Sequence, residues 1–320
     1  TKYSKELSDL ERALTIFHVK KISKIELKNG IEIDLIGFHG QTIFHNPQIK
    51  ITKQLGDGNL LSQLLKKPVI YDFRQADIDN NGQGAPLTPI YHRLLVNNFL
   101  NKNKDKSAFP ICIVNIGGIS NATIINNISE NIEDDLIAYD IGPGNCLIDE
   151  WIRKNSNKKF DKNGSFAKNG NIDNLILNQA IDNFSNSSYK NSLDVKDFDP
   201  SFARGLSLED GCATLTKFTA YLISHGVKHI NNLNSNNPKI NLICGGGRKN
   251  ETLVKEINNH FEDKKTIFEK IDKYGFNGDF IESQSFAYLA IRTFLNLPIS
   301  FPSTTGCKKP IVGGIINKNF

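Results

Sequence analysis

The sequence predicts an α/β fold, and three observations lead to this prediction. Short apolar runs typical of strands alternate with stretches of helical periodicity, mainly as β-α units in the second half of the chain. Three of the apolar runs end in glycine-rich turns. The chain has 320 residues, which is enough for about two domains.

The first third is expected to contain one helix and two short strands. Apolar residues recur at three- and four-residue steps over residues 4–25, which predicts a helix with one buried face. Alternating apolar and acidic residues predict a half-buried strand over residues 31–36, ending in the polar turn 37–42. A second strand is expected within residues 68–74, followed by the glycine-rich loop 80–86.

A stretch rich in lysine and asparagine, residues 101–107, marks the expected domain boundary. This boundary gives an N-terminal lobe of residues 1–107 and a C-terminal lobe of residues 108–320. The composition of the stretch is typical of an exposed connection between domains.

The C-terminal lobe is expected to begin with two strands joined by a Gly-Gly turn, over residues 110–125. A strand, a glycine turn and a helix that begins near Asn145 should follow. Residues 155–192 have weak periodicity and are expected to form helix interrupted by loops. Residues 239–250 read as a strand, a triple glycine and the start of a helix, and a last helix is predicted over about 279–295.

The composition excludes several classes of protein. At 39% hydrophobic and 23% charged, the chain is globular, and collagen-like or wholly disordered structures are excluded. It has no membrane-length apolar stretch and no signal-peptide pattern, so a cytosolic location is expected, with no membrane partner. Five scattered cysteines without a CxxC pair indicate neither disulfides nor a zinc site. The formal charge of +5 is spread over many lysines, which fits an anionic small molecule and not a nucleic-acid partner.

Three glycine-rich turns, in residues 115–121, 140–145 and 245–247, are the strongest chemical signal. Glycine lets backbone N–H groups approach and converge on phosphate oxygens. One Gly-Gly turn alone would be an ordinary hairpin, but three occur in a chain that lacks GxxxxGK[ST] and GxGxxG. The combination favours a nucleotide held by two lobes and disfavours P-loop and dinucleotide-binding folds.

Several polar residues near these turns are candidates for chemistry. Asp140 precedes a glycine turn and a helix start, so it is either a general base beside a γ-phosphate or a helix cap. Asp72 and Asp77 flank Arg74 and form either a structural ion pair or a clamp on sugar hydroxyls. Glu282, in the first turn of the last helix, either complements the helix dipole or faces a ligand.

His39, Gln41 and Gln83 are further candidates for binding a polar ligand. His39 and Gln41 follow the first predicted strand, and Gln83 lies between two glycines. The structural alternative for His39 is a residue whose hydrogen bonds are satisfied inside the fold.

Six segments, taken together, resemble the anhydro-N-acetylmuramic acid kinase family. Members of this family are bacterial peptidoglycan-recycling enzymes and belong to the actin, hexokinase and Hsp70-like ATPase superfamily. The six stand in the family's order and approximate spacing and span nearly the whole chain: GFHGQT, YDFRQADIDNNGQGAPLTP, NIGGISN, YDIGPGN, ICGGGRKN and ESQSFAYLAIRTFLNLPISFPSTTG. The resemblance implies a two-lobed actin-like ATPase fold, related to ribonuclease H, with a cleft between the lobes.

The resemblance also implies the reaction and its cofactors, ATP and Mg²⁺. Water opens the 1,6-anhydro bridge of the amino sugar while the freed O6 takes the γ-phosphate, giving N-acetylmuramic acid 6-phosphate. Members of the family are similar in being homodimers. The expected small-molecule partners are therefore an amino sugar and ATP.

Residue roles follow from the same resemblance. Asp140 is expected to activate the attacking water, and Glu282 to assist it. The expected phosphate and adenosine contacts are Asn115, Gly117, Gly118, Gly142, Gly144, Gly245, Gly246, Gly247 and Asn250. The expected sugar contacts are His39, Gln41, Arg74, Asp77 and Gln83. No residue is expected to be a dedicated metal ligand.

The start of the chain departs from the family pattern. The family begins with a strand and a glycine-rich, Ser/Thr-bearing turn that ends in Asp-Gly, and nothing in residues 1–30 resembles it. Either the true N-terminus is absent from this sequence, which we favour, or the protein is a degenerate relative. A chain that really started at Thr1 is expected to have weak or absent kinase activity.

Two alternatives remain open at the level of sequence. The first is a kinase for another sugar in the same superfamily, since only the segments around residues 71–77 and 82–86 would select the acceptor. The second is a non-catalytic nucleotide- or sugar-binding module. Release of ADP that depends on the anhydro sugar separates the proposed kinase from both.

Overall fold

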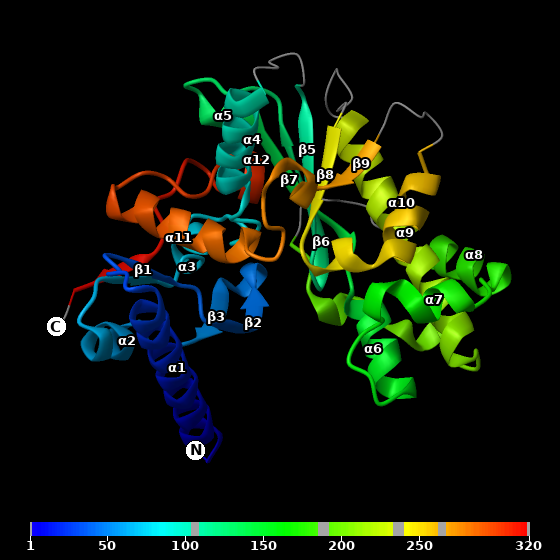
Figure 1. Cartoon of the computed structure of the whole chain (residues 1–320), viewed down its shortest axis with the longest axis horizontal. Helices are drawn as coiled ribbons and strands as arrows, with labels where there is room; N and C mark the ends of the chain where they lie inside the picture. Colours follow the sequence, from blue (N-terminus) through cyan, green and yellow to red (C-terminus); the bar gives the residue numbers. More distant parts are fainter. Residues whose placement is uncertain (1, 104–108, 185–191, 233–239, 262–266, 319–320) are drawn as a thin grey trace. The chain divides into compact units, whose positions relative to one another are not determined.

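The computed structural model describes residues 2–103, 109–184, 192–232, 240–261 and 267–318 (Figure 1). The chain divides into two compact units, one formed by residues 1–91 and 283–320 and the other by residues 92–282. Among the described helices, none combines the length and apolar character that crossing a membrane requires.

This division differs from the predicted boundary after residue 107. The C-terminal residues 283–320 group with the N-terminal unit. Both crossings between units fall within helices, α4 (Pro89–Asn103) and α11 (Ile281–Phe294). A continuous helix has no linker composition, so the sequence carries no signal at either crossing.

The first unit contains short helices and strands after one long helix. Its elements, besides its parts of α4 and α11, are α1 (Lys2–Asn29), β1 (Ile36–Phe38), β2 (Gln41–Asn46), η1 (Pro47–Ile49), β3 (Ile51–Leu55), α2 (Gly58–Leu65), β4 (Val69–Tyr71), α3 (Gln75–Asp79), α12 (Pro302–Thr305) and β10 (Ile315–Asn317). The strands form a three-stranded sheet, β1-β4-β10, and a β2-β3 hairpin.

The predicted N-terminal helix is confirmed as α1, but its predicted apolar face is largely exposed, with Leu7, Leu10 and Phe17 40%, 56% and 54% exposed. The predicted strand over residues 31–36 is wrong. Only residues 36–38 are extended and paired, in parallel register with β4. The segment before them leaves α1 through Gly30, which has φ 59°, and its Ile31 remains 49% exposed. Because β4 has only three residues, it offers backbone hydrogen bonds to a neighbouring strand of about the same length and not to a longer one.

The second unit is built around one larger sheet. Its elements, besides its parts of α4 and α11, are β5 (Ile111–Ile116), β6 (Ile119–Ile125), α5 (Ile132–Asp135), β7 (Leu136–Pro143), α6 (Cys146–Asn155), η3 (Lys162–Gly164), α7 (Ser165–Asn169), α8 (Asn174–Asn183), η4 (Val195–Asp197), η5 (Pro200–Ala203), α9 (Leu208–Asn232), β8 (Ile240–Cys244), η6 (Gly246–Lys249), α10 (Glu251–Asn259), β9 (Ile267–Lys270) and η7 (Ile271–Tyr274).

The five strands of this sheet lie in the order β7-β6-β5-β8-β9. β6 is antiparallel to both of its neighbours, whereas β5, β8 and β9 are parallel. If the strands of this unit are numbered 1 to 5 along the chain, their order in the sheet is 3-2-1-4-5, and strand 2 runs antiparallel to the others. This is the topology of the ribonuclease H-like fold. The α/β class predicted from the sequence is confirmed.

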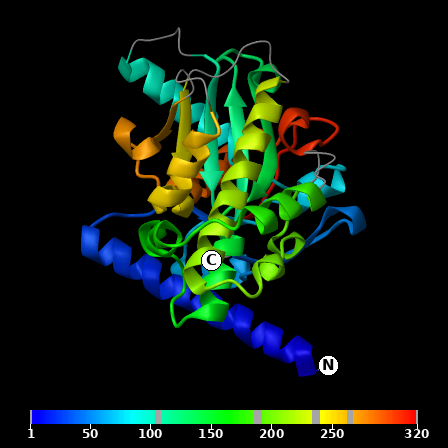
Figure 2. The same ribbon diagram turned by 90° about the vertical axis from the view of Figure 1, so that its right-hand side faces the viewer.

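Helices cover both faces of the five-stranded sheet. Ala220, Ile223 and Val227 of α9 pack on one face, where they join a buried cluster with alternate residues of β5, β6 and β8 (Figure 2). Side chains alternate between faces along a strand, so Thr123 points to the other face. There its Oγ1 pairs with Nδ1 of His92 of α4 at 2.8 Å.

Most elements predicted for the second half are confirmed. The β5-β6 hairpin, the β7 to α6 unit with Asn145 as the helix N-cap, the strand β8 before the triple glycine, and α11 all lie where the sequence placed them. The β2-β3 hairpin and β9 were missed, because polar residues interrupt their apolar pattern. Part of the segment predicted over residues 155–192, residues 185–191, lies outside the described residues.

Candidate functional site

The glycine turns after β5 and β7 are bonded directly to each other in the second unit. The N–H of Gly144 donates to the carbonyl oxygen of Gly118 at 2.8 Å, and the N–H of Asn145 donates to that of Gly117 at 2.7 Å. The side-chain Nδ2 of Asn145 donates to the same Gly117 oxygen at 2.9 Å. A Cβ on Gly144 would lie 2.2 Å from the Gly117 oxygen, so only glycine allows this approach.

The triple-glycine turn after β8 meets the same place. Gly245 has φ 79°, and a Cβ on it would lie 2.5 Å from both Oδ1 of Asn115 and the carbonyl oxygen of Ile116. A Cβ on Gly247 would lie 2.2 Å from Cγ2 of Ile116. The three turns that the sequence singled out therefore form one cluster, which we call the glycine-turn cluster.

Some glycines of this cluster make contacts within it, whereas others have open space beside them. The N–H groups of Gly144 and Asn145 are used inside the cluster, and Gly142 packs against Leu222. By contrast, a Cβ built on Gly118 or Gly246 would meet nothing closer than 3.5 Å and 3.9 Å, respectively. Open backbone for a ligand thus lies at Gly118 and Gly246, while Gly142 and Gly144 hold the turns together.

A row of four polar side chains crosses the sheet beside the cluster. Asp140 of β7 pairs across the strands with Asn121 of β6. Asn121 pairs in turn with Asn115 of β5, and Asn115 pairs with Cys244 of β8. Directly paired residues point to the same face of a sheet, so all four point to the face that α4 covers. We call Asp140, Asn121, Asn115 and Cys244 the polar row.

Asp140 is 7% exposed, and its Oδ2 accepts a hydrogen bond from the N–H of Leu193 at 2.9 Å. It lies within β7, three residues before the strand ends at Pro143. The N-cap of the following helix is Asn145. The helix-cap alternative for Asp140 is therefore excluded, and its carboxylate remains the acidic group of the polar row.

Asn121 belongs to this site although it was not among the predicted site residues. Its Oδ1 is buried and accepts no hydrogen bond within the part of the chain that the structure describes. An unpaired buried acceptor costs free energy unless a ligand or water satisfies it. The sequence signal was the last letter of NIGGISN, which the structure pairs with Asp140 across the strands.

Cys244 and Asn115 are in contact at the other end of the row. The Sγ–H of Cys244 donates to Oδ1 of Asn115 at 3.6 Å. Burial raises the pKa of the Cys244 thiol to about 12, and the negative charge of Glu282 contributes to this rise. Glu282 itself is exposed in the first turn of α11, where the sequence placed it.

Arg248 fixes the triple-glycine turn and was not predicted. Its guanidinium is 5% exposed and donates to both carboxylate oxygens of Asp272, at 2.7 and 3.1 Å. It also donates to the carbonyl oxygen of Gly245 and to Asp279, each at 2.9 Å. The two carboxylates raise its pKa further above the ordinary value. The buried guanidinium, held by two partly exposed carboxylates, keeps the Gly245 carbonyl in place.

A cavity of about 450 Å³ opens beside the cluster in the second unit. Three predicted or adjacent residues, Asn145, Gly246 and Asn250, line it. Asn250 is also the N-cap of α10, where its Oδ1 accepts from the N–H of Leu253 at 3.0 Å. The cavity is therefore the space that the predicted adenosine contacts border.

The predicted sugar residues lie in the first unit, where His39 and Arg74 are bonded to each other. The Nε–H of Arg74 donates to Nε2 of His39 at 3.0 Å, and Nδ1 of His39 lies 2.8 Å from the carbonyl oxygen of Gly40. This pairing fixes a neutral ring that donates from Nδ1 and accepts at Nε2. Burial, followed by the positive charge of Arg74, lowers the pKa of His39 to about 3.

Asp77 organises the loop that carries Gln83. It is fully buried, and its carboxylate accepts from the N–H of Gly84 at 2.7 Å and from the hydroxyls of Ser300 and Thr305, at 2.5 and 2.7 Å. A Cβ on Gly82 would lie 2.1 Å from the carboxylate. Asp77 thus connects the glycine-rich loop to the segment 300–305.

Arg74 and Gln83 meet at the same loop. The Nη1 of Arg74 donates to the carbonyl oxygen of Gly84 at 2.7 Å. The backbone of Gln83 donates to the carbonyl oxygen of Thr305 at 2.8 Å, and its carbonyl lies 3.0 Å from Nε2 of His45. Gln41 lies apart from these contacts, since its exposed amide donates to Thr42 at 3.4 Å.

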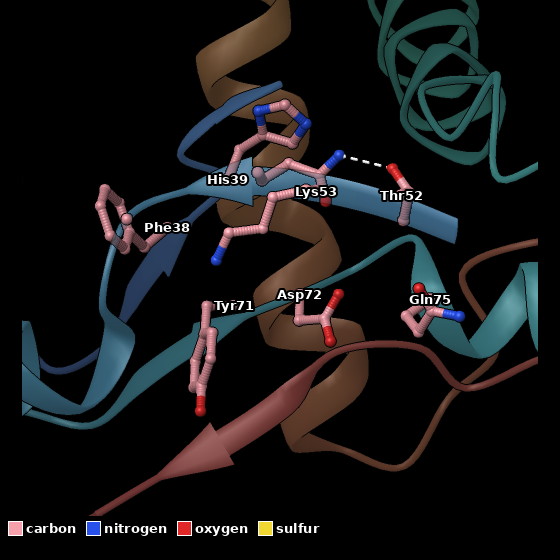
Figure 3. Close-up of a pocket in the computed structure, with 9 residues that line it drawn as sticks. Phe38, His39, Thr52, Lys53, Tyr71, Asp72 and Gln75 are labelled. Atoms are coloured by element: carbon pink, nitrogen blue, oxygen red, sulfur yellow. Dashed lines mark hydrogen bonds between the residues drawn. The ribbon is translucent and has the colours of Figure 1, made fainter. Parts of the chain in front are cut away.

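A small polar pocket of about 150 Å³ adjoins His39 (Figure 3). Lys53, Tyr71 and Asp72 line it, and Nε2 of Gln54 donates to Oγ1 of Thr52 at 2.8 Å along one wall. Asp72 adopts φ 54°, a left-handed conformation that is uncommon outside glycine. Burial raises the pKa of its carboxyl, although the N–H of Gln75 opposes the rise.

Within the described ranges, no three His, Cys, Asp or Glu residues are grouped as they would be to hold a metal ion. The five cysteines are all buried and free.

Comparison with known proteins gives similarities that cover nearly the whole of this chain. A family model for anhydro-N-acetylmuramic acid kinase matches residues 4–319. A protein of that name from Pelagibacter ubique (strain HTCC1062) is 52% identical over 321 residues, which cover 99% of this chain and 82% of the relative. The protein of that name from Brucella canis (strain ATCC 23365 / NCTC 10854 / RM-666) is 39% identical over 313 residues, covering 97% of this chain and 80% of the relative.

Similarity to solved structures is much weaker. A ROK family glucokinase from Streptomyces griseus, in complex with glucose and AMPPNP, is 13% identical with a TM-score of 0.35, over 86% of this chain and 87% of that chain. The activator of 2-hydroxyisocaproyl-CoA dehydratase from Clostridium difficile is 15% identical with a TM-score of 0.36, over 59% of this chain and 62% of that chain. Similarity at this level says nothing about function.

Proposed function

Because this chain belongs to the anhydro-N-acetylmuramic acid kinase family, we propose that it uses ATP to open 1,6-anhydro-N-acetylmuramic acid hydrolytically and to phosphorylate it at O6. The observation that carries the proposal is the joining of the three glycine turns into one cluster beside Asp140. A nucleotide-using enzyme needs such a surface, where backbone amides and a carboxylate stand close together.

The chemistry assigned to Asp140 is general-base catalysis. Its carboxylate takes a proton from the water whose oxygen bonds to C1 of the sugar, and the C1–O6 bond breaks. O6 then bonds to the γ-phosphorus as the bond between that phosphorus and the bridging oxygen of ADP breaks. The position of Asp140 supports this role, because it places a carboxylate within hydrogen-bonding reach of the surface beside the glycine-turn cluster.

Asn121 and Glu282 are assigned supporting roles. The unpaired Oδ1 of Asn121 lies beside Asp140 and fits an acceptor that orients the attacking water. Glu282 lies near Cys244, at the other end of the polar row, where its charge reaches the thiol. Its exposure allows it to help position a charged or hydroxyl group of the ligands.

The reaction uses Mg²⁺, which neutralises charge on the transferring phosphoryl group. The residues present fit an ion that is held mainly by ATP oxygens and water, as Mg²⁺ commonly is. Asp140 and Asn121 supply oxygen donors, and the described residues contain no acidic group of three that would form an all-protein cage.

The sugar side of the reaction is assigned to the first unit. His39, which lines the polar pocket, and Arg74, which is bonded to His39, are proposed to bind the sugar. Gln83 and the exposed Gln41 are proposed to contribute to the same site. Asp77 contributes by holding the loop rather than by contacting the ligand. The nucleotide side is assigned to the glycine-turn cluster of the second unit.

The wider biological role is also part of this proposal. By analogy with the family, it includes a function in peptidoglycan recycling, a cytoplasmic location and a homodimeric assembly, with no nucleic-acid or membrane partner. The formal charge of +5 is compatible with two anionic substrates.

The test is ADP release by the purified protein with ATP and Mg²⁺, in the presence of one sugar at a time. ADP release that appears only with 1,6-anhydro-N-acetylmuramic acid, together with mass-spectrometric detection of the 6-phosphate, is expected. Release with glucose or N-acetylglucosamine instead would identify a kinase for another sugar. Binding of ADP without turnover on any sugar would contradict the proposed activity.

A further inference from the structure

His92 of α4 is a fully buried histidine that the proposed mechanism does not use. Its Nδ1 lies 2.8 Å from Oγ1 of Thr123 on β6. Its Nε2 is also buried, but it has no hydrogen-bond partner among the residues that the structure describes. His39, by contrast, has both of its ring nitrogens bonded. A buried polar atom without a partner costs free energy, so the Nε2 of His92 requires an explanation.

His92 lies beside the polar row. Residues i and i+2 of a strand point to the same face and stand about 6.6 Å apart, so Asn121 and Thr123 are neighbours on one face of β6. This is the face that α4 covers, where His92 contacts Thr123. His92 therefore contacts the residue that is next on this face to the cross-strand pair of Asn121 and Asp140.

The position of α4 on the sheet does not depend on His92 alone. Arg93, the next residue, donates from Nε and Nη2 to Oδ2 of Asp135, at 3.0 and 2.6 Å. Asp135 is buried and also accepts from the N–H of Ser129 at 2.7 Å. This ion pair anchors α4 to the segment that leads into β7, so the buried ring of His92 is available for another task.

The contact with Thr123 decides which ring nitrogen of His92 carries the proton. Burial lowers the pKa of His92 to about 3, so at neutral pH the ring has one N–H donor and one acceptor nitrogen. Within the described ranges, Oγ1 of Thr123 has no other hydrogen-bond partner. Its hydroxyl hydrogen is therefore satisfied only when it is donated to Nδ1. The proton of the ring is then on Nε2.

In this form the ring of His92 complements the side chain of Asn121. Nε2–H of His92 is a buried donor without an acceptor, and Oδ1 of Asn121 is a buried acceptor without a donor, in the part of the chain that the structure describes. One water molecule between them satisfies both atoms, since a buried water is stable with about two to four polar partners. With the proton on Nδ1, the two atoms would both be acceptors, and the hydroxyl of Thr123 would have nothing to donate to.

We propose that His92 is a positioning residue, which holds the side-chain amide of Asn121 through one buried water molecule. Oδ1 of Asn121 has two lone pairs, so this bond leaves one for the water that attacks the sugar. His92 thus acts on the reaction through Asn121 and does not touch the substrates. The inference rests on the proposed function, in which Asn121 orients the water that Asp140 activates.

The first experiment compares two amide side chains of different length at position 92. The amide of Gln extends about as far from the backbone as Nε2 of His, whereas that of Asn extends only about as far as Nδ1. His92→Asn is expected to lower kcat about 10- to 100-fold, because the attacking water is held less accurately. The KM values for ATP and the sugar should stay within about twofold, since ground-state binding is not affected.

His92→Gln is expected to recover most of the kcat that His92→Asn loses, because its amide N–H can reach the bridging water. The kcat of each variant is referred to its capacity for ADP binding, so that unfolded protein does not count. A wild-type kcat in His92→Asn, or equal losses in the two variants, would overturn the inference. A purely structural role would not separate kcat from KM in this way.

His260→Asn is the matched control. The Nε2 of His260 is likewise buried without a partner within the described residues. His260 is the C-cap of α10, and its ring contacts Tyr221 of α9, the helix on the opposite face of the sheet. Its replacement should leave kcat unchanged. Similar losses of kcat in His260→Asn and His92→Asn would show a general effect on the fold and would overturn the inference.

The second experiment tests whether His92 acts through Asn121. Asn121→Ala removes the acceptor of the bridging water, so His92→Asn should lower kcat no further when it is added to Asn121→Ala. The cycle of wild type, two single variants and the double variant is measured under the same conditions. Additive losses would show that His92 acts independently of Asn121, which contradicts the inference.

The third experiment needs only the wild-type protein. Long-range proton–nitrogen correlation spectra of protein labelled with nitrogen-15 in its histidines distinguish an Nε2–H ring from an Nδ1–H ring. His92 is identified by its nuclear Overhauser contact with the methyl group of Thr123. At pH 7 a neutral Nε2–H ring is expected, and an Nδ1–H ring or a charged ring would overturn the inference.

The outcomes separate this inference from the proposed function. If the wild type releases no ADP with the anhydro sugar, the proposed function fails, and the spectrum still decides the state of the His92 ring. Normal turnover by the wild type together with an Nδ1–H ring, or with additive losses in the cycle, contradicts only the role of His92.

Discussion

The glycine-turn cluster of the second unit and the His39 to Asp77 region of the first unit are built in opposite ways. In the cluster, backbone meets backbone, and a single Cβ on Gly144 would lie 2.2 Å from a carbonyl oxygen. Around Asp77, buried side chains hold a loop through hydrogen bonds from Ser300, Thr305 and Gly84. The glycine-turn cluster therefore depends on the absence of side chains at its glycines, whereas the region around Asp77 depends on particular buried side chains.

The largest effect is expected at Asp140, the residue that we propose as the general base. Asp140→Asn should lower kcat by about 10²- to 10⁴-fold, because the amide cannot accept the proton. ADP affinity should stay within about twofold, since a base contributes little to ground-state binding. Steady-state kinetics and calorimetry measure the two quantities. An Asn variant with wild-type kcat would remove Asp140 from the mechanism.

Asp77→Ala tests whether the hydrogen bonds to the Asp77 carboxylate stabilise the first unit. The change leaves the N–H of Gly84 and two hydroxyls without their buried acceptor. We expect the free energy of unfolding to fall by about 3 kcal/mol, as for other broken buried networks. Urea denaturation measures it. The control is Asp79→Ala, an exposed neighbour on α3, and equal stability of the two variants would contradict the role of Asp77.

Gly144→Ala tests the backbone contact in the second unit. The added Cβ forces the turn away from Gly117, and a loss of about 1–3 kcal/mol in the free energy of unfolding is expected, as for other overpacked sites. Gly246→Ala is the matched control, since its Cβ would meet nothing closer than 3.9 Å. If both variants unfold at the same urea concentration, the close approach is not what fixes the cluster.

Arg74→Ala separates binding from structure in the first unit. Arg74 contacts His39 and the carbonyl of Gly84, and it is assigned to the sugar. The KM for the sugar should rise about tenfold with kcat little changed, which is the pattern of lost uniform binding. Initial-rate kinetics over a range of sugar concentrations check this. An unaltered KM would make Arg74 a structural residue.

The most gradual effect, spread over several pH units, concerns the protonation of His39. Its pKa of about 3 lies below the ordinary 6.5, so the unfolded chain binds more protons between these values. The free energy of unfolding should therefore fall as pH falls through this window, by at most about 1.4 kcal/mol per pH unit from this residue. His39→Gln should show a shallower slope in urea titrations from pH 6.5 to 4. Identical slopes would show that His39 is not held neutral.

Sequence reasoning reached the glycine-turn cluster because glycine is a local signal. The three turns follow apolar strands, and the structure joins them through Gly117, Gly118 and Gly245. It gave no role to Asn121 or Arg248, although they stand in the segments NIGGISN and ICGGGRKN. Their contacts depend on residues distant in the sequence: Asn121 pairs with Asp140 across two strands, and Arg248 bonds to Asp272 and Asp279.

The sequence by itself determined the α/β class, most strands and helices of the second unit and the glycine-rich turns that follow three of its strands. These features depend on periodicity and on glycine, which act over a few residues. Only the tertiary structure decided that residues 283–320 complete the first unit and that Asp77 is a buried support. Contacts between residues more than 200 positions apart, such as Asp77 with Ser300, leave no trace in a local pattern.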